Sequence, residues 1–149
     1  ERATRDYRER GEFREIFRKL AASLAALAVL PMLVLVLWGP TLFAFVFGEP
    51  WRAAGQVARL LAVMYFLKFI ASPLSYSYNV VDKQPENFAL HVYIVTSTTI
   101  ILALGTRIVR DDTATLLAFA LNYALFYVVY LVRSYKFSGG VVGRAVRRA

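Results

Sequence analysis

Four long apolar stretches constrain this chain more than any other feature of its sequence. They cover residues 20–38, 60–81, 88–105 and 113–132, and among them only the second holds a residue of type Asp, Glu, Lys or Arg, namely Lys68. A helix rises 1.5 Å per residue, so about 20 apolar residues cross the roughly 30 Å hydrocarbon core of a bilayer. An α-helix also satisfies its own backbone N–H and C=O groups inside lipid. The sequence therefore predicts an all-α polytopic membrane protein with four transmembrane helices, over about 20–38, 56–81, 88–105 and 113–132.

The composition supports this prediction and excludes several other classes of protein. Hydrophobic residues make up 58% of the chain, whereas a soluble domain is about half apolar. The chain has no cysteine, which excludes a disulfide framework and a thiolate metal site. It contains no HExxH, GxSxG or phosphate-binding glycine loop. We therefore expect neither enzymatic activity nor a cofactor.

Charged residues gather at the two ends of the chain. Residues 1–19 hold seven basic and five acidic side chains, residues 133–149 hold five basic and no acidic ones, and the net charge is +8. By the positive-inside rule, both termini, together with Lys83 in the middle turn, are expected on the cytoplasmic side. Next to four spans, lipid phosphates are nearer anions than nucleic acid. We therefore expect membrane lipid as a partner and no nucleic acid.

The two ends are expected to lie outside the transmembrane region of 20–132. Residues 133–149 are predicted to form a basic cytoplasmic tail. Residues 1–19 are predicted to form a basic amphipathic lead-in along the inner leaflet, because apolar residues recur there at helical spacing: Phe13, Ile16, Phe17 and Leu20. The alternative is a charged loop that continues into a helix. The chain begins at Glu1 and not at Met, so we expect it to be a segment of a longer chain.

Proline, glycine and aspartate residues mark the expected ends of the spans. Gly39-Pro40 is expected to close the first span, and Thr41–Phe47 to form a separate short piece in the membrane interface. Pro31 is expected to bend the first span. Pro85 and Asn87 are expected to start the third helix, and Asp111-Asp112-Thr113 to cap the fourth.

Polar side chains at membrane depth are the most informative residues for function. Lys68 lies near the middle of the expected second helix, where a lysine costs about 2.5 to 3.5 kcal/mol unless it faces a cavity or a partner. Around it, with Pro73 available to open the backbone, a polar stripe recurs at three- and four-residue spacings: Tyr65, Ser72, Ser75, Tyr76 and Asn79. The stripe is interpreted as the lining of a wet path. The alternative is a lysine that snorkels to the interface, beside serines that bond to preceding carbonyl groups.

The third and fourth helices carry further polar residues. The run Thr96-Ser97-Thr98-Thr99 and Asn122 are expected to form hydrogen bonds between helices. Tyr130 is expected to belong to an aromatic belt at the membrane interface. His91 has no carboxylate at i±4, which favours a structural role over a proton relay.

Three stretches resemble the C-terminal domain of bacterial polysaccharide biosynthesis proteins, which are oligosaccharide flippases related to the multidrug and lipid II exporters. The resemblance runs from about residue 12 to residue 133, and the stretches that carry it are Phe47–Gly55, with an FGxxWxxAG pattern, Ala71-Ser72-Pro73-Leu74-Ser75, and the turn with Lys83-Gln84. It implies a two-lobed fold around a central cavity, with this chain as the last four helices of the second lobe. It also implies export of an undecaprenyl-pyrophosphate-linked oligosaccharide across the cytoplasmic membrane of a bacterium or archaeon.

The resemblance implies that a cation at membrane depth meets the pyrophosphate. Lys68 is the first candidate and Arg59 a second, although the two are nine residues apart and face opposite sides of a helix. Four helices alone form no cavity between two lobes, so the expected partners include the remainder of the same polypeptide or other transmembrane subunits. The alternative is a small four-helix membrane scaffold or assembly subunit. A cation exporter would need acids at membrane depth, and none lies in the four expected spans.

Overall fold

The computed structural model describes residues 13–75 and 77–139, and this part of the chain is helical without any strand. Four of its helical segments are long and apolar enough to cross a membrane. The chain is therefore an all-α, multi-pass membrane protein, as the apolar stretches predict. The elements in chain order are α2 (Arg14–Phe47), η1 (Glu49–Trp51), α3 (Arg52–Leu74), α4 (Ser77–Val80), α5 (Gln84–Leu104), the π-helical turn η2 (Gly105–Val109) and α6 (Asp112–Ser138).

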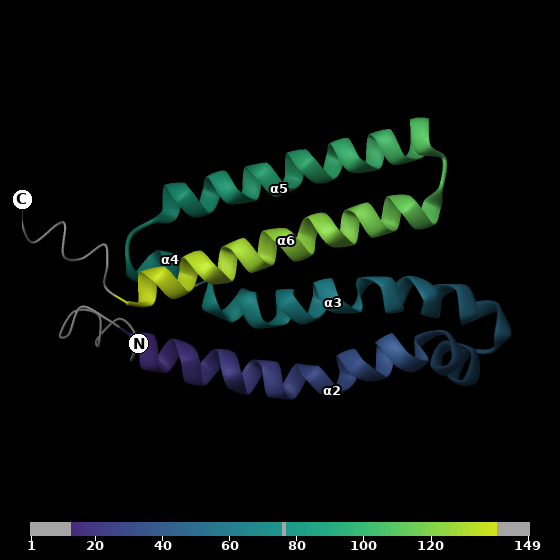
Figure 1. Ribbon diagram of the computed structural model, residues 1–149, viewed down its shortest axis with the longest axis horizontal. Coiled ribbons are helices and arrows are strands. Elements are labelled where there is room, and N and C mark those ends of the chain that lie inside the picture. The colour runs from purple at the N-terminus through teal and green to yellow at the C-terminus, as the bar shows by residue number, and fades with distance from the viewer. Residues whose placement is uncertain (1–12, 76, 140–149) are drawn as a thin grey trace, which may run out of the picture.

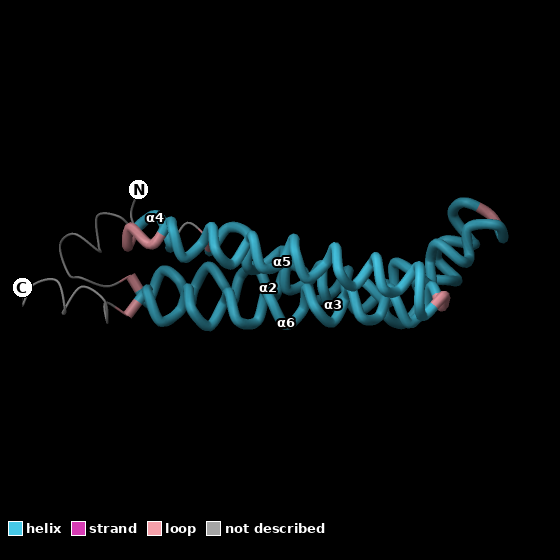
Figure 2. Tube along the Cα trace, turned by 90° about the horizontal axis from the view of Figure 1, so that it is seen from above, coloured by secondary structure: helices cyan, strands magenta, loops and turns pink. Residues whose placement is uncertain are grey.

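The four long helices lie side by side in the order α5, α6, α3 and α2 (Figure 1). In the view turned by 90° they overlap into a narrower body (Figure 2). α3 packs against α2 on one side and α6 on the other, and α6 packs against α5. The two inner helices α3 and α6 therefore carry most of the packing.

Both ends of the described chain lie at one end of the bundle, here named the terminal end (Figure 1). The backbone N–H of Phe13 donates a hydrogen bond to the carbonyl oxygen of Ser138 at 2.9 Å, which ties the start of α2 to the end of α6. The connection between α4 and α5 lies at the same end, and the turns at Gly48 and Arg110 lie at the opposite end, named the far end. This arrangement is the one expected for an even number of spans.

The first helix is longer than predicted, and its expected end at Gly39-Pro40 is wrong. α2 runs through Pro31 and Pro40 without interruption, so residues 41–47 are not a separate interfacial piece. It ends at Gly48, whose φ of 98° is left-handed and whose N–H donates to the carbonyl of Ala44. Glycine adopts this conformation readily, because it has no Cβ.

The packing of α2 on α3 explains why the helix continues past Pro40. A Cβ built on Gly55 would lie 2.5 Å from the carbonyl oxygen of Gly39 and 2.6 Å from the Cα of Pro40. The two backbones are therefore in direct contact at this crossing. Small residues allow such contact between membrane helices, and the contact holds the segment on both sides of the proline.

The expected continuous helix over 56–81 is wrong at its C-terminal end, because α3 ends at Leu74. Pro73 interrupts the backbone hydrogen bonding of the last turn. The hydroxyl of Ser75 donates to the carbonyl oxygen of Ser72, and the hydroxyl of Ser77 to that of Leu74, both at 2.7 Å. These bonds satisfy carbonyl groups at the end of α3 before α4 begins.

The segments at the terminal end also differ from the prediction. Residues 14–19 are helical and belong to α2, so they form neither a separate lead-in nor a loop before the helix. Phe13 and Phe17 are buried inside the bundle, and the Phe17 ring lies 5.8 Å from that of Tyr135. Residues 133–138 are helical and belong to α6, not to a tail. Residues 1–12 and 140–149 lie outside the described part.

The expected starts of the last two long helices are confirmed. α5 begins at Gln84, with Pro85 in its first turn. Asp111 caps α6, since its carboxylate accepts the N–H groups of Thr113 at 2.9 Å and Ala114 at 3.1 Å. An aspartate at this position satisfies donors that the helix leaves unpaired.

Asp111→Ala is expected to lower the free energy of unfolding by about 1 kcal/mol, because two N–H groups of α6 lose their acceptor. The change is measured by detergent-titrated unfolding of the purified chain. Asp112→Ala is the matched control, because the carboxylate of Asp111 makes both capping bonds. Equal losses from the two variants would contradict the capping role.

Hydrogen bonds between α5 and α6 follow the prediction. The amide nitrogen of Asn122 lies 3.0 Å from the hydroxyl of Ser97 and 3.4 Å from that of Thr98. Glu86, in the first turn of α5, forms an ion pair with Arg133 of α6. Polar contacts therefore join these two helices near the middle and at the terminal end.

Candidate functional site

A cavity of about 210 Å³ lies where α3, α5 and α6 meet, and we name it the Lys68 cavity. Lys68 is six residues before the end of α3, which corresponds to about 9 Å along the helix. The cavity is therefore nearer the terminal end than the far end. Its described lining residues are Lys68, Ala71 and Ser72 from α3, Ser75 directly after α3, His91 from α5, and Phe126, Tyr127 and Tyr130 from α6.

α3 contributes the polar residues that the sequence pattern singles out. Lys68, Ser72 and Ser75 are spaced i, i+4 and i+7, which places them on one face of the helix. Lys68 is exposed, and its Nζ lies 5.6 Å from the centroid of the Tyr65 ring. This distance is that of a cation–π contact. None of the ion pairs among residues 13–75 and 77–139 involves Lys68.

α5 and α6 form the opposite wall, and Asn87 fixes two of its side chains. The Nδ1 atom of His91 lies 2.8 Å from the backbone oxygen of Asn87. A carbonyl oxygen only accepts, so Nδ1 carries a proton and the Nε2 of the neutral ring is left as an acceptor. The hydroxyl of Tyr130 donates to Oδ1 of Asn87 at 2.7 Å. The His91 and Tyr130 rings are perpendicular to each other, with a centroid distance of 6.0 Å.

Tyr130 is buried, so its predicted place in an interfacial aromatic belt is wrong. Its ring lies 4.8 Å from that of Tyr78 and 5.6 Å from that of Phe126. α6 is an inner helix, and α4 and α5 both pack against it. This part of α6 therefore faces other helices and not lipid.

The other predicted site residues lie outside the Lys68 cavity. Tyr65 contacts Lys68 but lines a separate groove, and Asn79 is exposed on α4. Arg59 is exposed nearer the far end, close to Gly39 at the crossing of α2 and α3. Tyr76 lies outside the described residues. The structure thus brings together three of the seven candidates and adds a wall from α5 and α6 that the sequence did not predict as part of the site.

The groove that Tyr65 lines is apolar and lies between α2 and α3, with a volume of about 450 Å³. Its remaining lining residues are Leu27, Ala28, Pro31, Met32, Leu35, Ala58, Ala62, Phe66 and Phe69. Since Lys68 contacts Tyr65, a cation lies beside an apolar groove. This combination suits a molecule with an anionic head and an apolar chain.

Among the described residues, no acidic side chain lines the Lys68 cavity or the apolar groove beside Tyr65. The described acids lie in connections or in the first turn of a helix: Glu15, Glu49, Asp82, Glu86, Asp111 and Asp112. No group of His, Asp and Glu in this part of the chain is placed to hold a metal ion. The charge of the site therefore favours an anion.

No protein-family model, curated protein or solved structure matches the chain. The resemblance of its FGxxWxxAG stretch to the polysaccharide biosynthesis proteins therefore stays a prediction.

Proposed function

We propose that this chain is the C-terminal segment of a flippase that exports undecaprenyl-pyrophosphate-linked oligosaccharides for O-antigen, capsule or exopolysaccharide synthesis. The observation that carries the proposal is Lys68, an exposed lysine within a candidate membrane span, on a cavity whose described lining residues include hydroxyl groups and no acid. A lysine at membrane depth is costly unless it faces a cavity or a counter-charge. A pyrophosphate supplies that counter-charge.

The rest of the site matches the other parts of such a substrate. The hydroxyl group of Ser72 can donate to a phosphate oxygen, while the hydroxyl oxygen of Ser75 and the Nε2 of His91 can accept from sugar hydroxyls. The ring of Tyr127 offers a face against which a sugar can pack. The apolar groove beside Tyr65 accommodates part of an isoprenoid chain. One substrate therefore accounts for a cation, a polar cavity and an apolar groove that lie next to one another.

The proposed location is the cytoplasmic membrane of a bacterium or archaeon, with the terminal end of the bundle in the cytoplasm. The support is the basic charge at both chain ends, which follows the positive-inside rule. Large apolar side chains remain exposed on each long helix, for example Leu30, Val63, Val95 and Leu121. The proposed partners are therefore membrane lipid and either the remainder of the same polypeptide or other transmembrane subunits, and not nucleic acid.

The same exposed apolar faces favour a second candidate, a four-helix scaffold or assembly subunit without transport activity. In that case Lys68 would pair with an acid of a partner helix. The two candidates differ in what Lys68→Ala disrupts, since a scaffold loses its assembly and a flippase loses export from an assembly that still forms.

Lys68→Ala in the complete membrane protein is expected to reduce export of lipid-linked oligosaccharide at least tenfold, because the phosphate loses its cation. Lys68→Arg is expected to retain export within a few-fold, since the charge is kept. The measurement is the appearance of labelled glycan in the outer leaflet, together with membrane insertion of each variant. Lys83→Ala removes the same charge from the connection between α4 and α5 and serves as the control. Normal export by Lys68→Ala would exclude the proposed role.

A further inference from the structure

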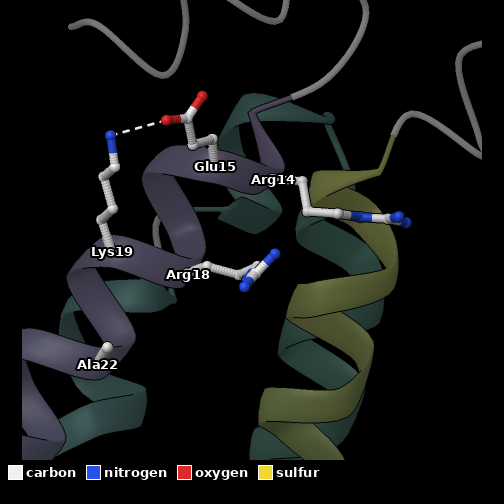
Figure 3. Close-up of a pocket in the computed structure, with 5 residues that line it drawn as sticks. All are labelled: Arg14, Glu15, Arg18, Lys19 and Ala22. Carbon is white, nitrogen blue, oxygen red and sulfur yellow. Dashed lines mark ion pairs between the residues drawn. The ribbon is translucent and has the colours of Figure 1, made fainter.

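A second cavity lies at the terminal end, on the first turns of α2 (Figure 3). Its volume is about 740 Å³, and the described residues that line it are Arg14, Glu15, Arg18, Lys19 and Ala22. None of the described residues lines both this cavity and the Lys68 cavity. It is therefore a different site from the one proposed to take part in export.

Two arginines of this cavity extend from α2 toward α6 (Figure 3). The guanidinium carbon of Arg14 lies 5.1 Å from the centroid of the Tyr135 ring on α6, so the first arginine is held in place by a cation–π contact. Arg18 follows one turn later and is exposed. Residues at i and i+4 are neighbours on a helix, where two like charges repel each other. An anion between them removes that repulsion.

The nearby acid does not neutralise these arginines. Glu15 forms an ion pair of 2.7 Å with Lys19, and these two side chains extend toward each other and away from Arg18 (Figure 3). Among the residues that the structure describes, no ion pair involves Arg14 or Arg18. The cavity therefore presents two guanidinium groups without a paired carboxylate.

The position of the cavity along α2 corresponds to the phosphate layer of a bilayer. From Leu20 to Phe47 the helix has no charged residue, so the hydrocarbon region begins directly after Lys19. Ala22 adds an apolar surface on the membrane side of the arginines. A lipid in this position has its phosphate beside the arginines and its acyl chains along the uncharged part of the helix.

We infer that this cavity binds the phosphate group of an anionic phospholipid between Arg14 and Arg18. Guanidinium groups bind phosphate through two parallel hydrogen bonds, which a compact ammonium group does not provide. The lipid neutralises the repelling pair and fixes the depth of α2 in the cytoplasmic leaflet. Anionic lipids attract basic residues at the membrane surface in general, and here two fixed guanidinium groups make one defined site.

The test is native mass spectrometry of the full chain in detergent, titrated with phosphatidylglycerol, phosphatidylcholine or glycerol 3-phosphate. One phosphatidylglycerol is expected to bind at least tenfold more tightly than phosphatidylcholine and than glycerol 3-phosphate. The R14Q/R18Q double variant is expected to lose at least tenfold in affinity for phosphatidylglycerol. R18Q alone is expected to lose several-fold, and it leaves the contact of Arg14 with Tyr135 intact.

R107Q/R110Q is the charge-matched control, because it removes two arginines from the far end. It is expected to retain phosphatidylglycerol affinity within twofold. Unchanged affinity in both R14Q/R18Q and R18Q, or an equal loss in R107Q/R110Q, would overturn the site. Equal affinity for glycerol 3-phosphate would show that the cavity binds free phosphate esters and not a lipid.

Discussion

Gly55→Leu is expected to lower the free energy of unfolding by about 3 kcal/mol, which is the upper end of the usual cost of overpacking. The reason is the crossing of α2 and α3, where a Cβ on Gly55 would lie 2.5 Å from the carbonyl oxygen of Gly39. The nearest atoms belong to the backbone, so no side chain can rotate away to make room. The two helices must separate, and the apolar groove between them changes shape.

Unfolding of the purified chain by increasing denaturing detergent measures this effect. Trp38 and Trp51 are the only tryptophans in the chain and lie close in sequence to Gly39 and Gly55, so their fluorescence reports on the crossing. Ala53→Leu introduces the same side chain at an exposed position two residues earlier, and its effect is expected to be within about 0.5 kcal/mol. If Gly55→Leu were as stable as Ala53→Leu, the close approach of the two backbones would be wrong.

This crossing also shows why the sequence predicted four spans but not all of their ends. The spans follow from apolar length, which is a local property of the chain. Proline and aspartate marked the starts of α5 and α6 correctly at Pro85 and Asp111, because these residues act on the helix turn that contains them. Pro40 gave the wrong end for α2. The contact of Gly39 with Gly55 depends on a residue in the next helix, which no local pattern reveals.

The candidate site could likewise be predicted from the sequence only in part. Helical spacing alone placed Lys68, Ser72 and Ser75 on one face of α3. It did not reveal the opposite wall, because which helix packs against which depends on the whole bundle. His91 and Tyr130 were assigned separate roles, whereas both bond to Asn87. The i, i+4 spacing of Asn87 and His91 indicates in the sequence that these two residues can bond to each other. No sequence pattern indicates that Tyr130 of α6 also bonds to Asn87.

Tyr78→Ala is expected to lower the free energy of unfolding by about 3 to 5 kcal/mol, the usual cost of removing a buried aromatic ring. Tyr78 is fully buried, and its ring lies 4.8 Å from that of Tyr130 and 5.1 Å from that of Phe137. It therefore attaches the short helix α4 to α6. Since Tyr130 lines the Lys68 cavity, the same substitution also loosens the wall of the site.

Tyr78→Phe is expected to leave stability unchanged or raise it by about 1 kcal/mol, because it keeps the ring and removes only the hydroxyl. That hydroxyl is buried without a well-aligned hydrogen bond to any described residue, and the nearby hydroxyl of Ser134 is in the same situation. An unsatisfied buried polar group is costly, so its removal favours the folded state. The difference between the effects of the two substitutions separates the contribution of the ring from that of the hydroxyl.

Detergent-induced unfolding of the purified variants measures both effects on one scale, and Tyr93→Ala provides the control. Tyr93 is a tyrosine on α5 that is 55% exposed, so its removal is expected to cost less than about 1 kcal/mol. If Tyr78→Ala cost no more than Tyr93→Ala, α4 would not be held against α6 by this ring. A loss of several kcal/mol in Tyr78→Phe would instead mean that the hydroxyl has a bonding partner. The packing of Tyr78, Tyr130 and Phe137 therefore predicts a specific order of stability: Tyr78→Phe above Tyr93→Ala, and Tyr93→Ala above Tyr78→Ala.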